Sequence, residues 1–207
     1  MQDALKQVRE LKRQAVRGQR FTGYSGRVRA VAGVFALLGA VAMSLPSYPR
    51  TPRAHLIGWS VVLAAALIVN YSALLHWFLF HPDAKRDLQR LMPTVDALPP
   101  LLVGAVLSAV FILEGRFELL FGTWMSLYGL ANLSSRRVLP RAIWPVGAYY
   151  IIAGAICLFL APAFTNPWPL GLVFFFGEWA GGMVFHRNRV ADAPMSSLFL
   201  KRGPSDE

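Results

Sequence analysis

One carboxylate lies in the middle of a long apolar segment of this chain of 207 residues. Glu178 sits within the run from Pro169 to Arg187, and at about 1.5 Å per residue it lies about 13 Å from either end. A hydrocarbon core is about 30 Å thick, so a membrane-crossing helix here would place Glu178 near the midplane. Such a carboxylate is costly unless it faces other helices, accepts hydrogen bonds or carries a proton. We therefore expect Glu178 to face the interior of a helical bundle.

Other polar side chains fall at a similar predicted depth in neighbouring apolar segments. The candidates for a polar layer around Glu178 are Asn70, Tyr71, Tyr128, Tyr149 and Tyr150. This layer can be a structural hydrogen-bond network, or it can line a pathway for a proton or small solute. We expect no second acidic or basic group at the depth of Glu178 to form a relay, and this favours the structural interpretation.

The sequence contains no pattern typical of a metal site, a cofactor site or an enzyme. His76 and His186 lie toward the same predicted end of their segments, near the level of Asp96, so a ligand set is conceivable. No two histidines have the spacing of ligands on one helix. The single cysteine, Cys157, excludes intramolecular disulfides and Cys-based metal motifs. We find no H-E-x-x-H, no G-x-S-x-G and no Gly-rich phosphate loop, and we predict no cofactor and no catalytic activity.

The composition indicates a membrane protein. Hydrophobic residues make up 55% of the chain and charged residues only 15%, whereas soluble domains are roughly 25% charged. The net charge of +10 does not by itself indicate nucleic acid, because the basic residues lie between apolar runs and form no single patch. We expect membrane lipids as partners and no nucleic acid.

The elements that must position the polar residues are apolar segments of membrane-spanning length, which predict an all-α integral membrane bundle of six helices. The six predicted spans are Val28–Leu45, Leu56–Phe80, Thr94–Leu113, Phe117–Leu133, Leu139–Ala161 and Trp168–His186. Pro99 and Pro100 should kink the third span or delay its start, because neither donates a backbone hydrogen bond. Four tryptophans fall near predicted span ends, where an indole can anchor at the membrane interface with its N–H satisfied and its ring buried: Trp59, Trp77, Trp144 and Trp168.

The basic residues predict the orientation of these spans. All of the 21 Lys and Arg residues except Arg50, Arg53 and Arg116 lie in the N-terminal segment, the 81–92 and 134–141 loops or the C-terminal tail. This distribution places both termini in the cytoplasm and requires an even number of spans. Arg116 lies between Glu114 and Glu118, which predicts a solvated ion-pair cluster in the short opposite turn.

Two terminal segments flank the predicted domain of residues 28–187. Residues 1–27 form a basic amphipathic segment, predicted as a short cytoplasmic helix, that can lie on anionic lipid headgroups or serve only as a solvated positive flank. Residues 188–207, with Pro194, Gly203 and Pro204, are predicted to be a flexible cytoplasmic tail.

Small residues recur at the spacing that lets membrane helices approach closely. The pairs are Gly177 with Gly181, Gly104 with Ser108, and Gly122 with Ser126. We expect them to pack helices within one chain; association of two copies through such a face is the alternative. The sequence Phe-Gly-Thr-Trp at 121–124 also returns as Phe-Gly-Glu-Trp at 176–179, which is compatible with a duplicated two-helix hairpin.

Short motifs in the second half of the chain resemble those of other membrane proteins. Trp124, Tyr128 and Gly129, then Ser135-Arg136-Arg137 and the glycine-containing segment from Gly147 to Pro162, make residues 117–187 similar to a group of small bacterial polytopic membrane proteins without an assigned activity. The resemblance implies a location in the bacterial inner membrane. It implies no chemistry and carries over no binding residue.

Two functions are compatible with these patterns. The first is an integral inner-membrane protein of structural, accessory or sensing type, in which the polar layer serves packing. The alternative is a small-solute or proton-coupled transporter or channel that uses Glu178. Under the first, replacing Glu178 by Gln should leave folding nearly intact; under the second, flux should be lost from a folded protein.

Overall fold

A computed structural model describes residues 26–80, 95–134 and 141–191, and this part of the chain is all-helical. It contains six α-helices and two short 3-10 helices and no strand. In chain order they are α2 (Gly26–Ser44), α3 (Pro52–Phe80), α5 (Leu98–Leu113), η3 (Phe117–Leu119), α6 (Leu120–Ser134), η5 (Arg141–Ile143), α7 (Trp144–Leu160) and α8 (Trp168–Ala191). The predicted all-α class is therefore confirmed.

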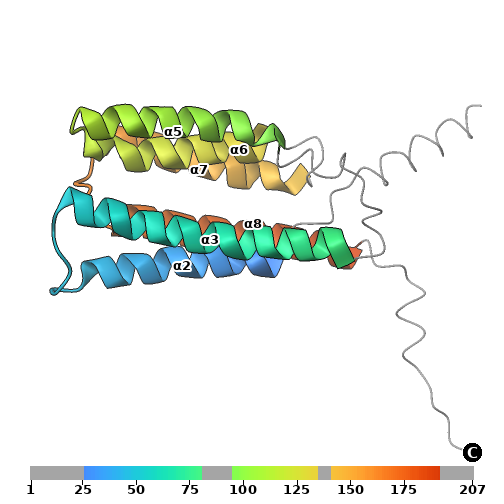
Figure 1. The fold of residues 1–207 in the computed structure, drawn as a ribbon. Helices are drawn as coiled ribbons and strands as arrows, with labels where there is room; N and C mark the ends of the chain where they lie inside the picture. Colours follow the sequence, from blue (N-terminus) through green and yellow to red (C-terminus); the bar gives the residue numbers. More distant parts are fainter. Residues whose placement is uncertain (1–25, 81–94, 135–140, 192–207) are drawn as a thin grey trace, which may run out of the picture.

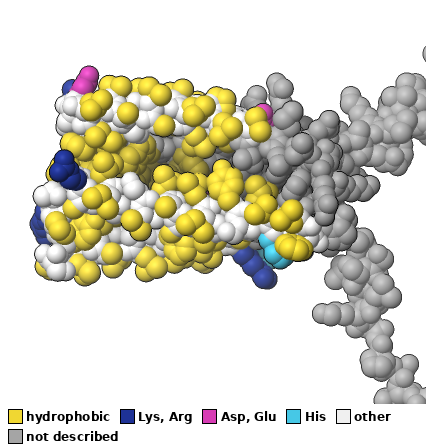
Figure 2. All heavy atoms as spheres, viewed as in Figure 1, with side chains coloured by type: hydrophobic (Ala, Val, Ile, Leu, Met, Phe, Trp, Pro, Cys, Tyr) yellow, Lys and Arg dark blue, Asp and Glu magenta, His cyan; other side chains and the backbone are white. Residues whose placement is uncertain are grey.

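Three of these helices are long and apolar enough to cross a membrane. The candidate spans are Gly26–Ser44 in α2, Pro52–His76 in α3 and Trp168–Arg187 in α8. Helices α5 and α7 are apolar but shorter. Figure 2 shows hydrophobic side chains along the length of the bundle and charged side chains toward its two ends. This arrangement is compatible with a membrane location.

The helices form two groups of three. Helix α2 packs most closely against α8 and also contacts α3, while α6 packs most closely against α7 and also contacts α5. Figure 1 shows α2, α3 and α8 as one layer and α5, α6 and α7 as the other. Contacts of α8 with α7 and α6 connect the α2–α3–α8 group to the α5–α6–α7 group. The side chains at this contact therefore hold the two helix groups together.

Prolines mark where two helices begin. Pro99 and Pro100 stand at the start of α5, so they delay its regular start and do not kink its interior. Pro145 has the same place in α7. The first turn tolerates proline because its backbone N–H groups have no partner within the helix. At the other end of α7, Ala161 adopts a left-handed conformation with φ 41° and the following Pro162 ends the helix.

The observed helices overlap the predicted segments, with differences of four or five residues at four ends. Helices α5 and α7 begin at Leu98 and Trp144, later than the predicted Thr94 and Leu139. Helix α3 begins at Pro52, earlier than predicted, and α8 continues to Ala191, beyond the predicted end at His186 and into the predicted tail. The predicted N-terminal helix, the rest of the tail and Ser135-Arg136-Arg137 lie outside the described residues. The number of membrane crossings remains a prediction.

The small-residue pairs pack helices of one chain against each other. An added Cβ at Gly122 would lie 2.7 Å from the Gly154 carbonyl oxygen of α7, and one at Gly104 would lie 3.3 Å from Leu127 of α6. The repeated four-residue motifs differ in their surroundings, since Phe121 is 1% exposed and its counterpart Phe176 is 58% exposed. These surroundings give the proposed duplication no support from matching contacts.

Candidate functional site

A buried ion pair joins the first turn of α2 to the middle of α8. Arg29 Nε lies 2.8 Å from Glu178 Oε2, and Arg29 Nη2 donates to Glu178 Oε1 at 3.1 Å. The two residues are only 8% and 4% exposed. The prediction that no second charged group lies at the depth of Glu178 is therefore wrong. Glu178 does face the interior of the bundle, as expected.

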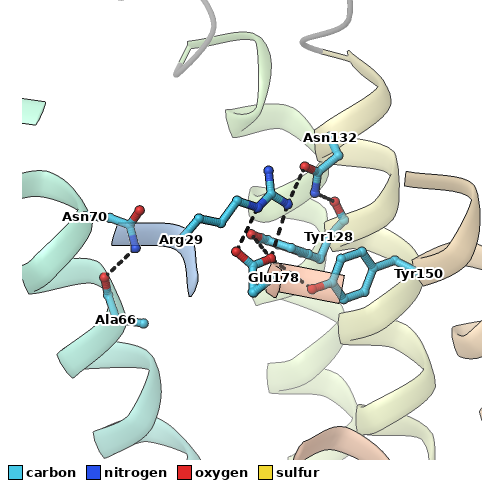
Figure 3. Close-up of polar contacts among 7 residues, drawn as sticks. All are labelled: Arg29, Ala66, Asn70, Tyr128, Asn132, Tyr150 and Glu178. Carbon is cyan, nitrogen blue, oxygen red and sulfur yellow. Dashed lines mark hydrogen bonds and ion pairs between the residues drawn. The ribbon is translucent and has the colours of Figure 1, made fainter. Parts of the chain in front are cut away.

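The α5–α6–α7 group supplies the remaining partners of this pair (Figure 3). The hydroxyl groups of Tyr128 on α6 and Tyr150 on α7 donate to Glu178 Oε1 at 2.8 and 2.9 Å. Arg29 Nη2 also donates to Asn132 Oδ1 at 2.8 Å, and Asn132 Nδ2 donates to the Tyr128 carbonyl oxygen at 2.9 Å. These five residues are called the Arg29–Glu178 network below.

The network uses both oxygens of the carboxylate. Oε1 accepts three hydrogen bonds, and Oε2 forms the ion pair with Arg29 Nε. An ionised carboxylate offers about four acceptor positions in total. Buried charges are tolerated when they are paired and their remaining positions are hydrogen-bonded. Glu178 meets both conditions, so little acceptor capacity remains for a further ligand.

Glycines make the close approach of these side chains possible. A Cβ at Gly181 would lie 2.5 Å from Arg29 Nε, and a Cβ at Gly177 would collide with the Tyr150 phenol. On α2, a Cβ at Gly33 would lie 3.0 Å from the Cβ of Glu178. The Gly177–Gly181 pair therefore faces the network within one chain, and this face is not free for association between copies.

The stagger of α2 and α8 explains why Arg29 meets Glu178. The two helices run antiparallel, with Gly26 against Gly182 and Ala40 against Gly171. From Glu178, α8 runs about 20 Å further to Ala191. It therefore extends beyond Gly182, which lies beside the start of α2. Glu178 thus lies at the middle of α8 and also beside the first turn of α2. Counting residues within separate spans does not reveal this relation.

The structure brings together only part of the predicted polar layer. Tyr128 and Tyr150 contact Glu178 as described. Asn70 donates to the Ala66 carbonyl oxygen on its own helix at 2.9 Å (Figure 3), and Tyr71 is 49% exposed. The Tyr149 hydroxyl donates to the Val173 carbonyl oxygen at 3.2 Å on an exposed part of the surface. We find no contact of these last three with Glu178 among the described residues.

Arg29 and Asn132 were not predicted as site residues, although the sequence position of each indicates a polar contact inside the bundle. Arg29 is the second residue of the first predicted span, where an arginine needs a partner or access to water. Its charge also fits the basic N-terminal flank, which hides this signal. Asn132 follows Tyr128 by one helical turn and therefore shares its face of α6. Which faces meet across the bundle is set by tertiary packing.

His76, Asp96 and His186 are not brought together as a possible metal-binding group in the part of the chain that the structure describes. The described residues contain no group of three or more His, Cys, Asp or Glu side chains that could hold a metal ion. The His76 ring instead contacts Phe80, with centroids 5.1 Å apart. At the opposite end of the bundle, Arg116 Nε pairs with Glu118 Oε1 at 2.6 Å, so the predicted exposed ion pair is confirmed for these two residues.

The fold and the network together define an all-helical protein that carries a buried, hydrogen-bonded ion pair and three helices of membrane-spanning length and hydropathy. Comparison of the chain with protein-family models, with curated proteins and with solved structures finds no match.

Proposed function

We propose that this chain is an integral protein of the bacterial inner membrane with six spans, both termini in the cytoplasm, and a structural, accessory or sensing role without catalysis. In this role the Arg29–Glu178 network holds the α2–α3–α8 group against the α5–α6–α7 group. The hydropathy of the helices and the uneven distribution of Lys and Arg support the location and orientation. The resemblance of residues 117–187 to small bacterial membrane proteins supports the organism class.

The contacts of Glu178 are the main support for the structural role. The Glu178 carboxylate is paired with an arginine and accepts hydrogen bonds from two tyrosines on the other helix group. A group that transfers a proton or binds a cation needs an acceptor position that becomes available in the working cycle. In the observed arrangement, residues of the chain itself occupy those positions. This is expected of a hydrogen-bond network that holds helices together.

A double-mutant cycle tests this role. Removing one partner of a buried pair leaves the other charge without compensation and costs about 3–5 kcal/mol. We therefore expect Arg29→Gln and Glu178→Gln each to lower the Tm of the detergent-purified protein by about 10 °C. The double variant should lose clearly less than the sum of the two losses, because no lone charge remains. This replaces the earlier expectation that Glu178→Gln leaves folding intact.

The exposed pair of Arg116 and Glu118 is the matched control. Its side chains are 56% and 34% exposed, and exposed pairs contribute little to stability. Arg116→Gln and Glu118→Gln should therefore leave the Tm close to that of the wild type. Measurement of the four Tm values of each cycle in one detergent checks both expectations.

Transport through the network is the competing function, because ionisable groups within membrane segments often mark ion pathways. Proteoliposomes loaded with a pH-sensitive dye measure proton flux directly. Flux in the wild type that disappears in Glu178→Gln, together with an unchanged Tm, would refute the structural role. Absence of flux together with the coupled losses of Tm supports it.

A further inference from the structure

The end of α3 that lies farthest from the Arg29–Glu178 network carries two buried nitrogen atoms without a hydrogen-bond partner. They are His55 Nε2 and Trp59 Nε1, and their residues are 0% and 5% exposed. Arg29 Nε is the other buried side-chain nitrogen without a hydrogen bond in the described residues, and it is ion-paired with Glu178. The burial of Trp59 also corrects its predicted place as an anchor at the membrane interface.

The two nitrogens have complementary chemistry. His55 Nδ1 lies 3.1 Å from the Thr51 carbonyl oxygen, which can only accept, so Nδ1 carries the ring hydrogen. In a neutral imidazole with the hydrogen on Nδ1, Nε2 is an acceptor. Trp59 Nε1–H can only donate. One buried acceptor and one buried donor therefore lack partners on the same helix.

Helix geometry places these two side chains on one face of α3. His55 and Trp59 are four residues apart, so they lie on the same face of α3. Long side chains on a helix lean toward its N-terminus, and the Trp59 indole therefore leans over the turn that carries His55. The two nitrogens form no direct hydrogen bond with each other. A small molecule that accepts from one and donates to the other completes both.

The surroundings restrict the chemistry of that molecule. The Tyr48 ring contacts His55 at 5.2 Å, the Phe121 ring contacts Trp59 at 6.1 Å, and a Cβ at Gly58 would lie 2.5 Å from Met43 Sδ. The Tyr48 hydroxyl donates to the Ala54 carbonyl oxygen at 2.7 Å. None of these neighbouring side chains is charged, which favours a neutral ligand. Water is the smallest neutral molecule that both donates and accepts.

We propose that His55 and Trp59 form a binding site for one buried water molecule. The water donates to His55 Nε2 and accepts from Trp59 Nε1–H. The water thereby holds the Trp59 ring in the orientation in which it contacts Phe121 of α6. The site thus supports an aromatic contact between the two groups, at the far end from the Arg29–Glu178 network.

Nuclear magnetic resonance of the whole protein, labelled with 15N-tryptophan in detergent micelles, tests the site. The Trp59 indole proton, assigned by its loss in Trp59→Phe, should show a cross peak with water. The cross peak should be lost in His55→Phe, which removes one of the two partners. The Trp124 indole is the control, because its Nε1 donates to Ser108 Oγ at 2.7 Å and its signal should keep its position in His55→Phe.

Two results would overturn the proposal. One is the absence of a water cross peak at the Trp59 indole in the wild type, a measurement that needs no folded variant except for assignment. The other is a cross peak of full intensity in His55→Phe, which would mean that water reaches the indole without the imidazole. Thermal unfolding adds an independent readout. A bridged pair predicts that each single variant lowers the Tm and that the double variant falls no further than the worse single variant.

Discussion

At the scale of residues, the stability of this protein depends on whether each buried polar atom has a partner. Glu178 has four contacts from three residues, and its partner Arg29 is further held by Asn132. Charged groups in a medium of low dielectric constant interact strongly, and they are correspondingly costly when a partner is removed. We therefore attribute the burial of Glu178 to the complete set of contacts and not to any single bond.

Two adjacent tyrosines on α7 make this dependence measurable. The Tyr150 hydroxyl is buried and donates to the Glu178 carboxylate, whereas the Tyr149 hydroxyl is exposed and donates to a backbone carbonyl. A hydrogen bond to a charged group contributes about 1.5–3 kcal/mol. Tyr150→Phe should lower the Tm by about 5 °C, and Tyr149→Phe should change it little. Equal Tm values for the two variants would show that the Tyr150 hydroxyl does not stabilise the carboxylate.

At the scale of elements, close packing of antiparallel helices through glycines determines which side chains meet. Gly26, Gly33, Gly171 and Gly182 keep α2 and α8 in close contact along their length. In the proposed membrane location, hydrophobicity provides little attraction between helices, so close approach and polar contacts provide the specificity. The same glycines therefore fix the stagger that places Arg29 beside Glu178.

Gly181 tests this relation between packing and the ion pair. A side chain at 181 would displace the Arg29 guanidinium, since a Cβ there lies 2.5 Å from Nε. Overpacking of this kind costs about 1–3 kcal/mol, to which the loss of the ion pair adds. We expect Gly181→Val to lower the Tm by about 10 °C. Its neighbour Ala180 is exposed, so Ala180→Val should retain the wild-type Tm, and a comparable loss there would point to a general effect on α8.

At the scale of the whole molecule, the ends of the helices show which parts of the chain lie at each end of the bundle. The Gly26 end of α2 and the Ala191 end of α8 lie at the same end, and the 161–167 turn lies at the other (Figure 1). This agrees with an even number of passes for the described helices. The proposed orientation then places the 161–167 turn outside the cytoplasm and the end of α6 inside it.

Single cysteines on a Cys157→Ala background test that orientation. Asn166 and Ser134 are both exposed and lie at opposite ends of the bundle. A thiol reagent that cannot cross membranes should label Asn166→Cys in intact cells of a bacterial expression host. It should label Ser134→Cys only after permeabilisation. Labelling of both variants in intact cells would contradict the proposed topology.

The sequence by itself determined the helical class, the approximate limits of the helices and the inward direction of Glu178. Each of these follows from local properties, namely the length of apolar runs, the positions of prolines and the cost of a carboxylate in lipid. Tertiary structure alone decided that Arg29 and Asn132 are the partners of Glu178 and that Asn70, Tyr71 and Tyr149 are not. Partnership depends on the stagger and rotation of helices that are far apart in sequence, such as α2 and α8, and these arise from packing between faces.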